Sequence, residues 1–174
     1  MSDVVKKTKA WLLDVIIGLN LCPFAKKEFV NDTIRYSVCE HKKLKNALVQ
    51  LAFELKHLDE HNECETTLLI FDTGFKSFEQ YLDLVDLANG FIEQEGYSGV
   101  YQIASFHPDY LFEGEESSDT SHYTNRSPYP MLHLIREESM ERVLKSYKSP
   151  EQIPIDNIAN ARRKGAAFFE AYLK

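Results

Sequence analysis

Residues 105–136 contain most of the side chains in this sequence that could take part in chemistry. The segment reads SFHPDYLFEGEESSDTSHYTNRSPYPMLHLIR and lies between two short apolar runs. Loops of this length are usually functional or disordered, and the His-Pro and Ser-Pro-Tyr-Pro sequences favour an ordered loop because proline restrains φ. We therefore predict a functional site here. Its polar side chains are His107, Asp109, Tyr110, Glu113, Glu115, Glu116, Asp119, His122, Tyr123, Asn125, Arg126, Tyr129, His133 and Arg136.

Two residues are candidates for catalysis. The imidazole of His107 can act as a general acid or base near neutral pH, although a histidine can also be bound to a loop carbonyl group without any reaction. Cys22 precedes Pro23, which suits the first position of a short helix, so backbone donors and the helix dipole would stabilise a thiolate there. The apolar neighbours of Cys22 leave open the alternative of an inert core cysteine.

Five further residues are candidates for ligand binding. The guanidinium of Arg126 offers a planar set of donors to a carboxylate or phosphate group, or else forms an ion pair with the nearby acidic residues. Asn125 and Tyr129 can orient a ligand or stabilise the turn around the prolines. His133 and Asp72 lie in or directly after apolar runs, and His133 can also be a hydrogen-bonded residue of the sheet.

These residues favour an enzyme or binding protein for a small anionic metabolite, with Asn125 and Arg126 orienting the ligand and His107 as acid or base. The alternative is a protein–protein interaction module in which the acidic loop 113–119 binds a basic partner. Histidines and carboxylates together suit iron, manganese or zinc, but no HExxH or similar spacing occurs. We therefore predict no metal and no cofactor.

The composition is that of an ordinary globular protein, with 44% hydrophobic and 27% charged residues, and the length predicts a single domain over residues 1–174. The net charge of −7 and the scattered basic residues argue against nucleic acid as a partner. No apolar run approaches the ~20 residues that span a membrane. The three cysteines show no CxxC spacing, so we expect a cytoplasmic location. Nothing in the sequence indicates an oligomeric state.

Periodicity predicts strands that alternate with helices. Apolar residues at helical spacing or in alternation define each element, and Gly, Pro and capping residues define its ends. The predicted helices cover residues 3–19, 44–58, 77–96 and 138–148, with a last helix from Pro154 in which Gly165 allows close approach; the predicted strands cover residues 33–39, 66–72, 99–106 and 130–136.

The order of these elements predicts an α/β fold with a mixed four-stranded sheet flanked by helices. Helical crossovers would make the first three strands parallel, while the fourth, reached without a helix, would run antiparallel beside the third. His107 and His133 would then both lie near the C-terminal ends of the parallel strands, together with Asp72. Open α/β sheets bind ligands at those ends.

Three unusual strings occur in this order: CPFA at residues 22–25, FHPDY at 106–110 and YTNRSPYPMLH at 123–133. Together they resemble a bacterial family of uncharacterised proteins, domain of unknown function 1415, and the resemblance covers nearly the whole chain. It implies a bacterial protein and no particular activity.

Overall fold

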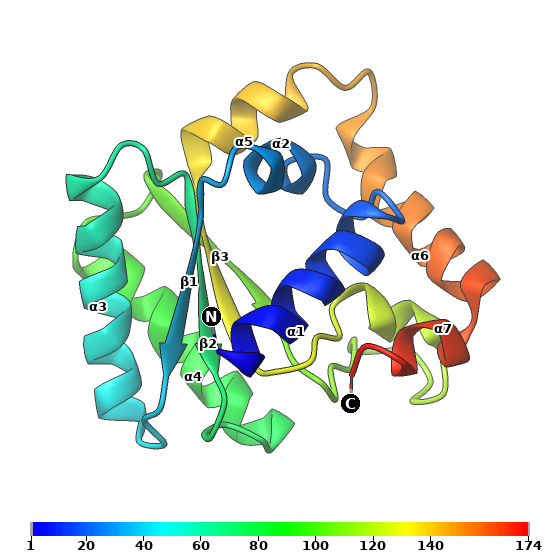
Figure 1. Cartoon of the computed structure of the whole chain (residues 1–174), viewed down its shortest axis with the longest axis horizontal. Helices are drawn as coiled ribbons and strands as arrows, with labels where there is room; N and C mark the ends of the chain where they lie inside the picture. The colour runs from blue at the N-terminus through cyan, green and yellow to red at the C-terminus, as the bar shows by residue number, and fades with distance from the viewer. Residues whose placement is uncertain (1, 174) are drawn as a thin grey trace.

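The computed structural model describes residues 2–173, so the predicted domain ends at residues 1 and 174 lie outside the described part. A four-stranded mixed sheet separates two layers of helices (Figure 1). The strands are β1 (Ile34–Cys39), β2 (Thr66–Phe71), β3 (Tyr101–Phe106) and β4 (Met131–Arg136). They lie in the order β1-β2-β4-β3, so β1 and β3 are the edge strands.

The mixed sheet and its flanking helices are confirmed, but the predicted arrangement of three parallel strands is wrong. Only β1 and β2 pair in parallel, whereas β4 pairs antiparallel with both β2 and β3. The fourth strand is inserted between the second and third, which separates two strands that point in the same direction. The expected antiparallel pairing of the fourth strand with the third is present, with Phe106 opposite Met131.

Helices α3 (Leu44–Glu60) and α4 (Phe78–Gln94) cover one face of the sheet (Figure 1). Their buried stripes include Leu51, Leu55, Tyr81 and Leu84, which form one core cluster with the side chains of that face. β2 is buried along its whole length, as its continuous apolar sequence predicts. Ser77 accepts a hydrogen bond from Gln80 N and begins α4, as predicted.

The opposite face is covered by elements from both ends of the chain (Figure 1) and by one short helix from its middle. The second core cluster joins residues of these elements, such as Trp11, Val15 and Phe169, to Leu68 and Ile70 of β2. The elements on this side are α1 (Asp3–Trp11), the π-helical η1 (Leu12–Ile17), α2 (Ala25–Val30), the 3-10 helix η2 (Thr120–Thr124), α6 (Ile153–Lys164) and α7 (Ala166–Glu170).

Two glycines define the ends of these helices. A Cβ atom at Gly18, directly after η1, would collide with the carbonyl oxygen of Asp14. Gly165 has a φ of 78° and ends α6, and no atom lies close to the position of a Cβ there. The prediction that Gly165 lies inside a helix at a close approach is therefore wrong, because its left-handed conformation separates α6 from α7.

α5 (Glu137–Leu144) follows β4 directly and leads through the short η3 (Pro150–Gln152) to α6. None of the helices in residues 2–173 has both the length and the apolar character needed to cross a membrane.

Candidate functional site

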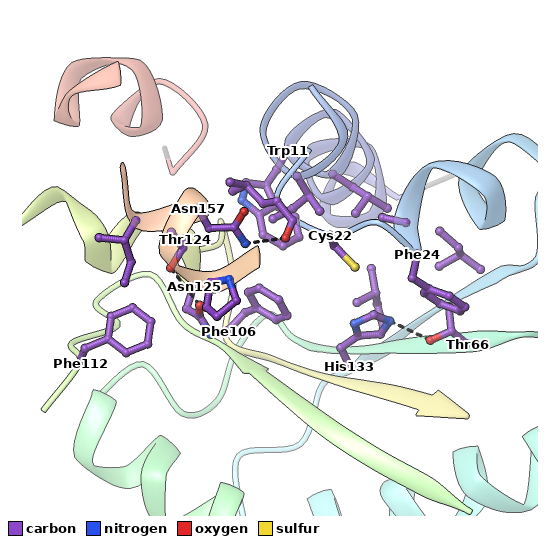
Figure 2. Close-up of a pocket in the computed structure, with 18 residues that line it drawn as sticks. Trp11, Cys22, Phe24, Thr66, Phe106, Phe112, Thr124, Asn125, His133 and Asn157 are labelled. Atoms are coloured by element: carbon purple, nitrogen blue, oxygen red, sulfur yellow. Dashed lines mark hydrogen bonds between the residues drawn. The ribbon is translucent and has the colours of Figure 1, made fainter. Parts of the chain in front are cut away.

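A cavity of about 290 Å³ lies between the sheet and the helices that come from the two ends of the chain (Figure 2). Its floor is formed by side chains of all four strands, one wall by the N-terminal helices, and the other by the 105–130 segment and α6. The lining residues are Trp11, Leu12, Ile16, Leu21, Cys22, Phe24, Ala25, Ile34, Thr66, Leu68, Phe106, Phe112, Thr124, Asn125, His133, Pro154, Asn157 and Ile158.

His133 of β4 supplies a hydrogen-bond acceptor to the floor of this cavity. The hydroxyl group of Thr66 donates its single proton to the carbonyl oxygen of Leu134, so it must accept a proton from Nε2 of His133, 2.8 Å away. This network assigns the Nε2–H tautomer and leaves a lone pair on Nδ1, which has no hydrogen-bond partner among residues 2–173. Burial lowers the pKa of His133 to about 4, so the ring is neutral at pH 7.

Cys22 supplies a thiol to the same cavity. It lies in the loop between η1 and α2, and its sulfur points into the cavity on the side where the His133 ring lies (Figure 2). Burial raises the pKa of the Cys22 thiol, and the backbone amides of Phe24 and Ala25 act in the opposite direction but do not compensate. The thiol is therefore protonated at neutral pH.

The amide and hydroxyl side chains at the cavity are held in place by the backbone. Nδ2 of Asn125 donates to Ser105 O at 3.1 Å, and Nδ2 of Asn157 donates to Leu21 O at 2.7 Å. The hydroxyl group of Thr124 lies 2.9 Å from Ser121 O and 3.1 Å from Oδ1 of Asn125. The bond of Asn125 fixes its loop to β3, and the bond of Asn157 fixes α6 to the loop that precedes α2, so both side chains are held at the edge of the cavity.

The chemistry of the lining defines what the cavity can hold. Within the described part of the chain, no Lys, Arg, Asp or Glu side chain lines it, and most of its residues are apolar. An ionised ligand would lose its hydration without gaining a counter-charge, which is strongly unfavourable. The site therefore suits a small, uncharged and mainly apolar molecule, whose one donor group can pair with Nδ1 of His133.

His107 lies on the other face of the sheet, so the predicted convergence of His107 and His133 is not observed. Nε2 of His107 donates to Phe75 O at 2.9 Å, and the amide of Asp109 donates to Nδ1 at 3.0 Å. The ring is fully buried beside Phe78 and Tyr81, and this burial lowers its pKa. Both ring nitrogens are occupied by backbone groups, which leaves none for a ligand.

The remaining predicted site residues, except Asn125, do not line the cavity. Nε of Arg126 donates to Tyr110 O at 3.1 Å, and the guanidinium lies 4.6 Å from the centre of the Tyr123 ring. Tyr129 is half-buried in the second core cluster. Asp72 follows β2, and its Oδ1 is buried without a hydrogen-bond partner in residues 2–173. The structure thus brings together Cys22, Asn125 and His133, but not Asp72, Arg126 or Tyr129.

The acidic loop is partly neutralised from within the chain. Arg162 of α6 contacts Asp119 at 2.9 Å and Glu115 at 3.3 Å. His122 is occupied in the same way as His107, because Phe112 N donates to Nδ1 and Nε2 donates to Glu116 O. No group of three or more possible metal ligands gathers within residues 2–173.

Several residues of the site were not predicted from the sequence. Thr66, which orients His133, begins a strand whose other side chains are almost all apolar, and a polar residue in such a run was a usable signal. Trp11, Phe24 and Asn157 carried no comparable signal, because their place at the cavity depends on how distant helices pack.

Comparison with protein families matches residues 3–171 to the family described as "Protein of unknown function (DUF1415)". No curated protein and no solved structure shows significant similarity to the chain.

Proposed function

We propose that this chain, which belongs to the DUF1415 family, binds a small, uncharged and mainly apolar molecule in the cavity above β4. The observation that carries the proposal is Nδ1 of His133, which has no hydrogen-bond partner in residues 2–173 and lies at the floor of a mainly apolar cavity. Its volume of about 290 Å³ is at the lower end of the range for ligand pockets, which favours a ligand of one or two rings.

The lining favours an uncharged ligand over the small anionic metabolite expected from the sequence. Arg126, the expected anion-binding residue, is bound to Tyr110 O and stacked on Tyr123, and it does not line the cavity. The imidazole ring of His133 is neutral at pH 7, so it cannot balance the negative charge of a carboxylate or phosphate ligand. Such a ligand would lose more in desolvation than it gains in contacts.

The proposal is tested with indole, which has one N–H donor, and 1-methylindole, which lacks it. We expect indole to bind in calorimetry and to raise the melting temperature, with 1-methylindole binding roughly tenfold more weakly because Nδ1 of His133 then stays unpaired. Benzoate should not bind.

Two tryptophan substitutions on α6 form a matched pair. Ile158→Trp fills the cavity and should abolish indole binding, whereas Ile155, which is 57% exposed and does not line the cavity, should tolerate Ile155→Trp with binding intact. Equal binding by both variants, or a preference for benzoate over indole, would reject the proposal.

A further inference from the structure

We infer that Cys22 and His133 carry out acyl transfer in this cavity, with Cys22 as nucleophile, His133 as base, and a small uncharged ester or thioester as substrate. The inference rests on the proposed function, because the substrate must first occupy the cavity. It adds a reaction to what is otherwise a binding site.

Both reacting groups line the same cavity. The Cys22 sulfur enters from the loop before α2, while Nδ1 of His133 faces the cavity from β4 (Figure 2). A molecule bound there contacts both side chains. Hydrogen bonds of catalytic groups are often long without substrate and shorten when it binds, so a direct Cys22–His133 bond is not required in the free protein.

The base has the orientation that the reaction needs. Thr66 binds Nε2–H of His133 and is itself fixed by Leu134 O, so the lone pair of Nδ1 is held toward the cavity. A nucleophile, a base and a third group that orients the base are the elements of activated nucleophiles in general. Thr66 is the positioning residue of this set.

Both groups rest in their neutral forms, and this determines how the thiol is activated. Burial raises the pKa of the Cys22 thiol and lowers the pKa of His133, so transfer of the proton from sulfur to Nδ1 is uphill in the free protein. The transfer must therefore occur together with the attack of the sulfur on the bound ester. The amides of Phe24 and Ala25 lie beside the sulfur and stabilise its negative charge during this transfer.

The step is balanced without any further reagent except water. The sulfur attacks the carbonyl carbon of the ester, Nδ1 takes the thiol proton, and the tetrahedral intermediate collapses with loss of the alcohol, which receives that proton. The acyl group is then a thioester on Cys22. Water, deprotonated by Nδ1, attacks this thioester and releases the acid, and the proton on Nδ1 returns to the sulfur.

The lining of the cavity restricts the substrate class. No cationic side chain in the described part of the chain lines the cavity, which argues against phosphate esters and acyl groups that carry a carboxylate. Cys39 and Cys64 belong to the core cluster on the other face of the sheet, so neither can form a disulfide with Cys22 as part of the reaction. The carboxylate product is itself disfavoured in the cavity, which promotes its release.

The test uses 4-nitrophenyl butanoate and its unreactive amide, N-(4-nitrophenyl)butanamide. We expect the ester to release one equivalent of nitrophenolate rapidly and to add one butanoyl group to the peptide that contains Cys22, with none on Cys39 or Cys64. Cys22→Ala should remove the adduct while still binding the amide in calorimetry. His133→Asn should slow acylation at saturating ester by about 100-fold or more. It should also weaken amide binding roughly tenfold, because Nδ1 no longer accepts the N–H group of the amide.

Thr66 provides a further control. Thr66→Val should slow acylation by about tenfold or more, because Nε2 of His133 loses its partner, and Thr66→Ser, which restores the hydroxyl group, should recover the rate. If Thr66 were only a structural residue, both variants would have a changed melting temperature, and Thr66→Ser would not recover the acylation rate.

The outcomes separate this inference from the proposed function. If the amide does not bind, the cavity is not a site for such molecules and the proposed function fails with the inference. If the amide binds but the ester leaves no adduct on Cys22, or Cys22→Ala and His133→Asn react as fast as the natural protein, only acyl transfer is overturned.

Discussion

Nε2 of His107 donates a 2.9 Å hydrogen bond to the carbonyl oxygen of Phe75, a residue with a φ of 57°. A phenylalanine in this left-handed region is strained by roughly 1–2 kcal/mol, so surrounding contacts must hold it there. The second ring nitrogen accepts from the amide of Asp109. His107 therefore connects the turn after β2 to the start of the long segment after β3.

Replacement of His107 by alanine is expected to lower the free energy of unfolding by about 2–4 kcal/mol. The substitution leaves the carbonyl group of Phe75 and the amide of Asp109 without partners and opens a void beside Phe78 and Tyr81. Urea unfolding measures the change, with the exposed His41→Ala as control. A loss below about 0.5 kcal/mol would contradict a structural role for His107.

The periodicity of the sequence was sufficient to predict the strands and most helices, but not the order of the strands. The apolar run of β2 is a local feature, so its burial could be predicted. Alternation in β1 predicts a single buried face, yet Ser37 and Cys39 are buried as well as Ile34, because helices cover both faces of the sheet. The insertion of β4 between β2 and β3 depends on contacts between distant segments, such as Leu68 opposite His133. No local pattern in the sequence determines that pairing.

The faces of the two histidines illustrate the same limit. Ala104 lies opposite His133, so strand alternation places Phe106 on the face of His133 and His107 on the other. The alternation along β3 could be seen in the sequence. Placing His107 and His133 on opposite faces of the sheet also required the register of β3 with β4. The partnership of Thr66 with His133 likewise requires the register of β2 with β4.

His133 is expected to make the protein less stable as the pH falls from about 6.5 to about 4. Its pKa is lowered from 6.5 in the unfolded chain to about 4 in the folded protein, so the unfolded state binds the proton first. The contribution of the neutral ring is thus complete above pH 6.5 and is lost as the pH falls through the folded pKa. The full loss is on the order of 3 kcal/mol.

Urea midpoints of the natural protein and His133→Gln, measured at several pH values across this interval, separate the contribution of His133 from that of the other groups. The difference in stability between the two proteins should shrink toward low pH. A difference that stays constant would mean that His133 is protonated equally in the folded and unfolded states.

Arg162 is expected to hold the acidic loop 113–119 against α6. Its guanidinium contacts Asp119 and Glu115, and Asp119 in turn accepts from Ser121 N at 2.7 Å at the start of η2. Arg162 holds the pKa of Asp119 well below its usual range, together with the Ser121 amide. Loss of the arginine should leave Asp119 beside an unbalanced Glu115 and loosen the start of η2.

Hydrogen exchange followed by mass spectrometry measures this effect on Arg162→Gln, with Arg163→Gln as the matched control, because Arg163 is bound only to Asn160 of the same helix in the described part of the chain. We expect faster exchange over residues 113–124 in Arg162→Gln alone, and a similar acceleration in the natural protein at high salt, since the ion pairs are exposed.

The same loop is the surface expected to bind a basic partner. Such a partner would compete with Arg162, so Arg162→Gln should bind polylysine more tightly than Arg163→Gln does; equal exchange and equal binding in both variants would show that Arg162 does not control this loop.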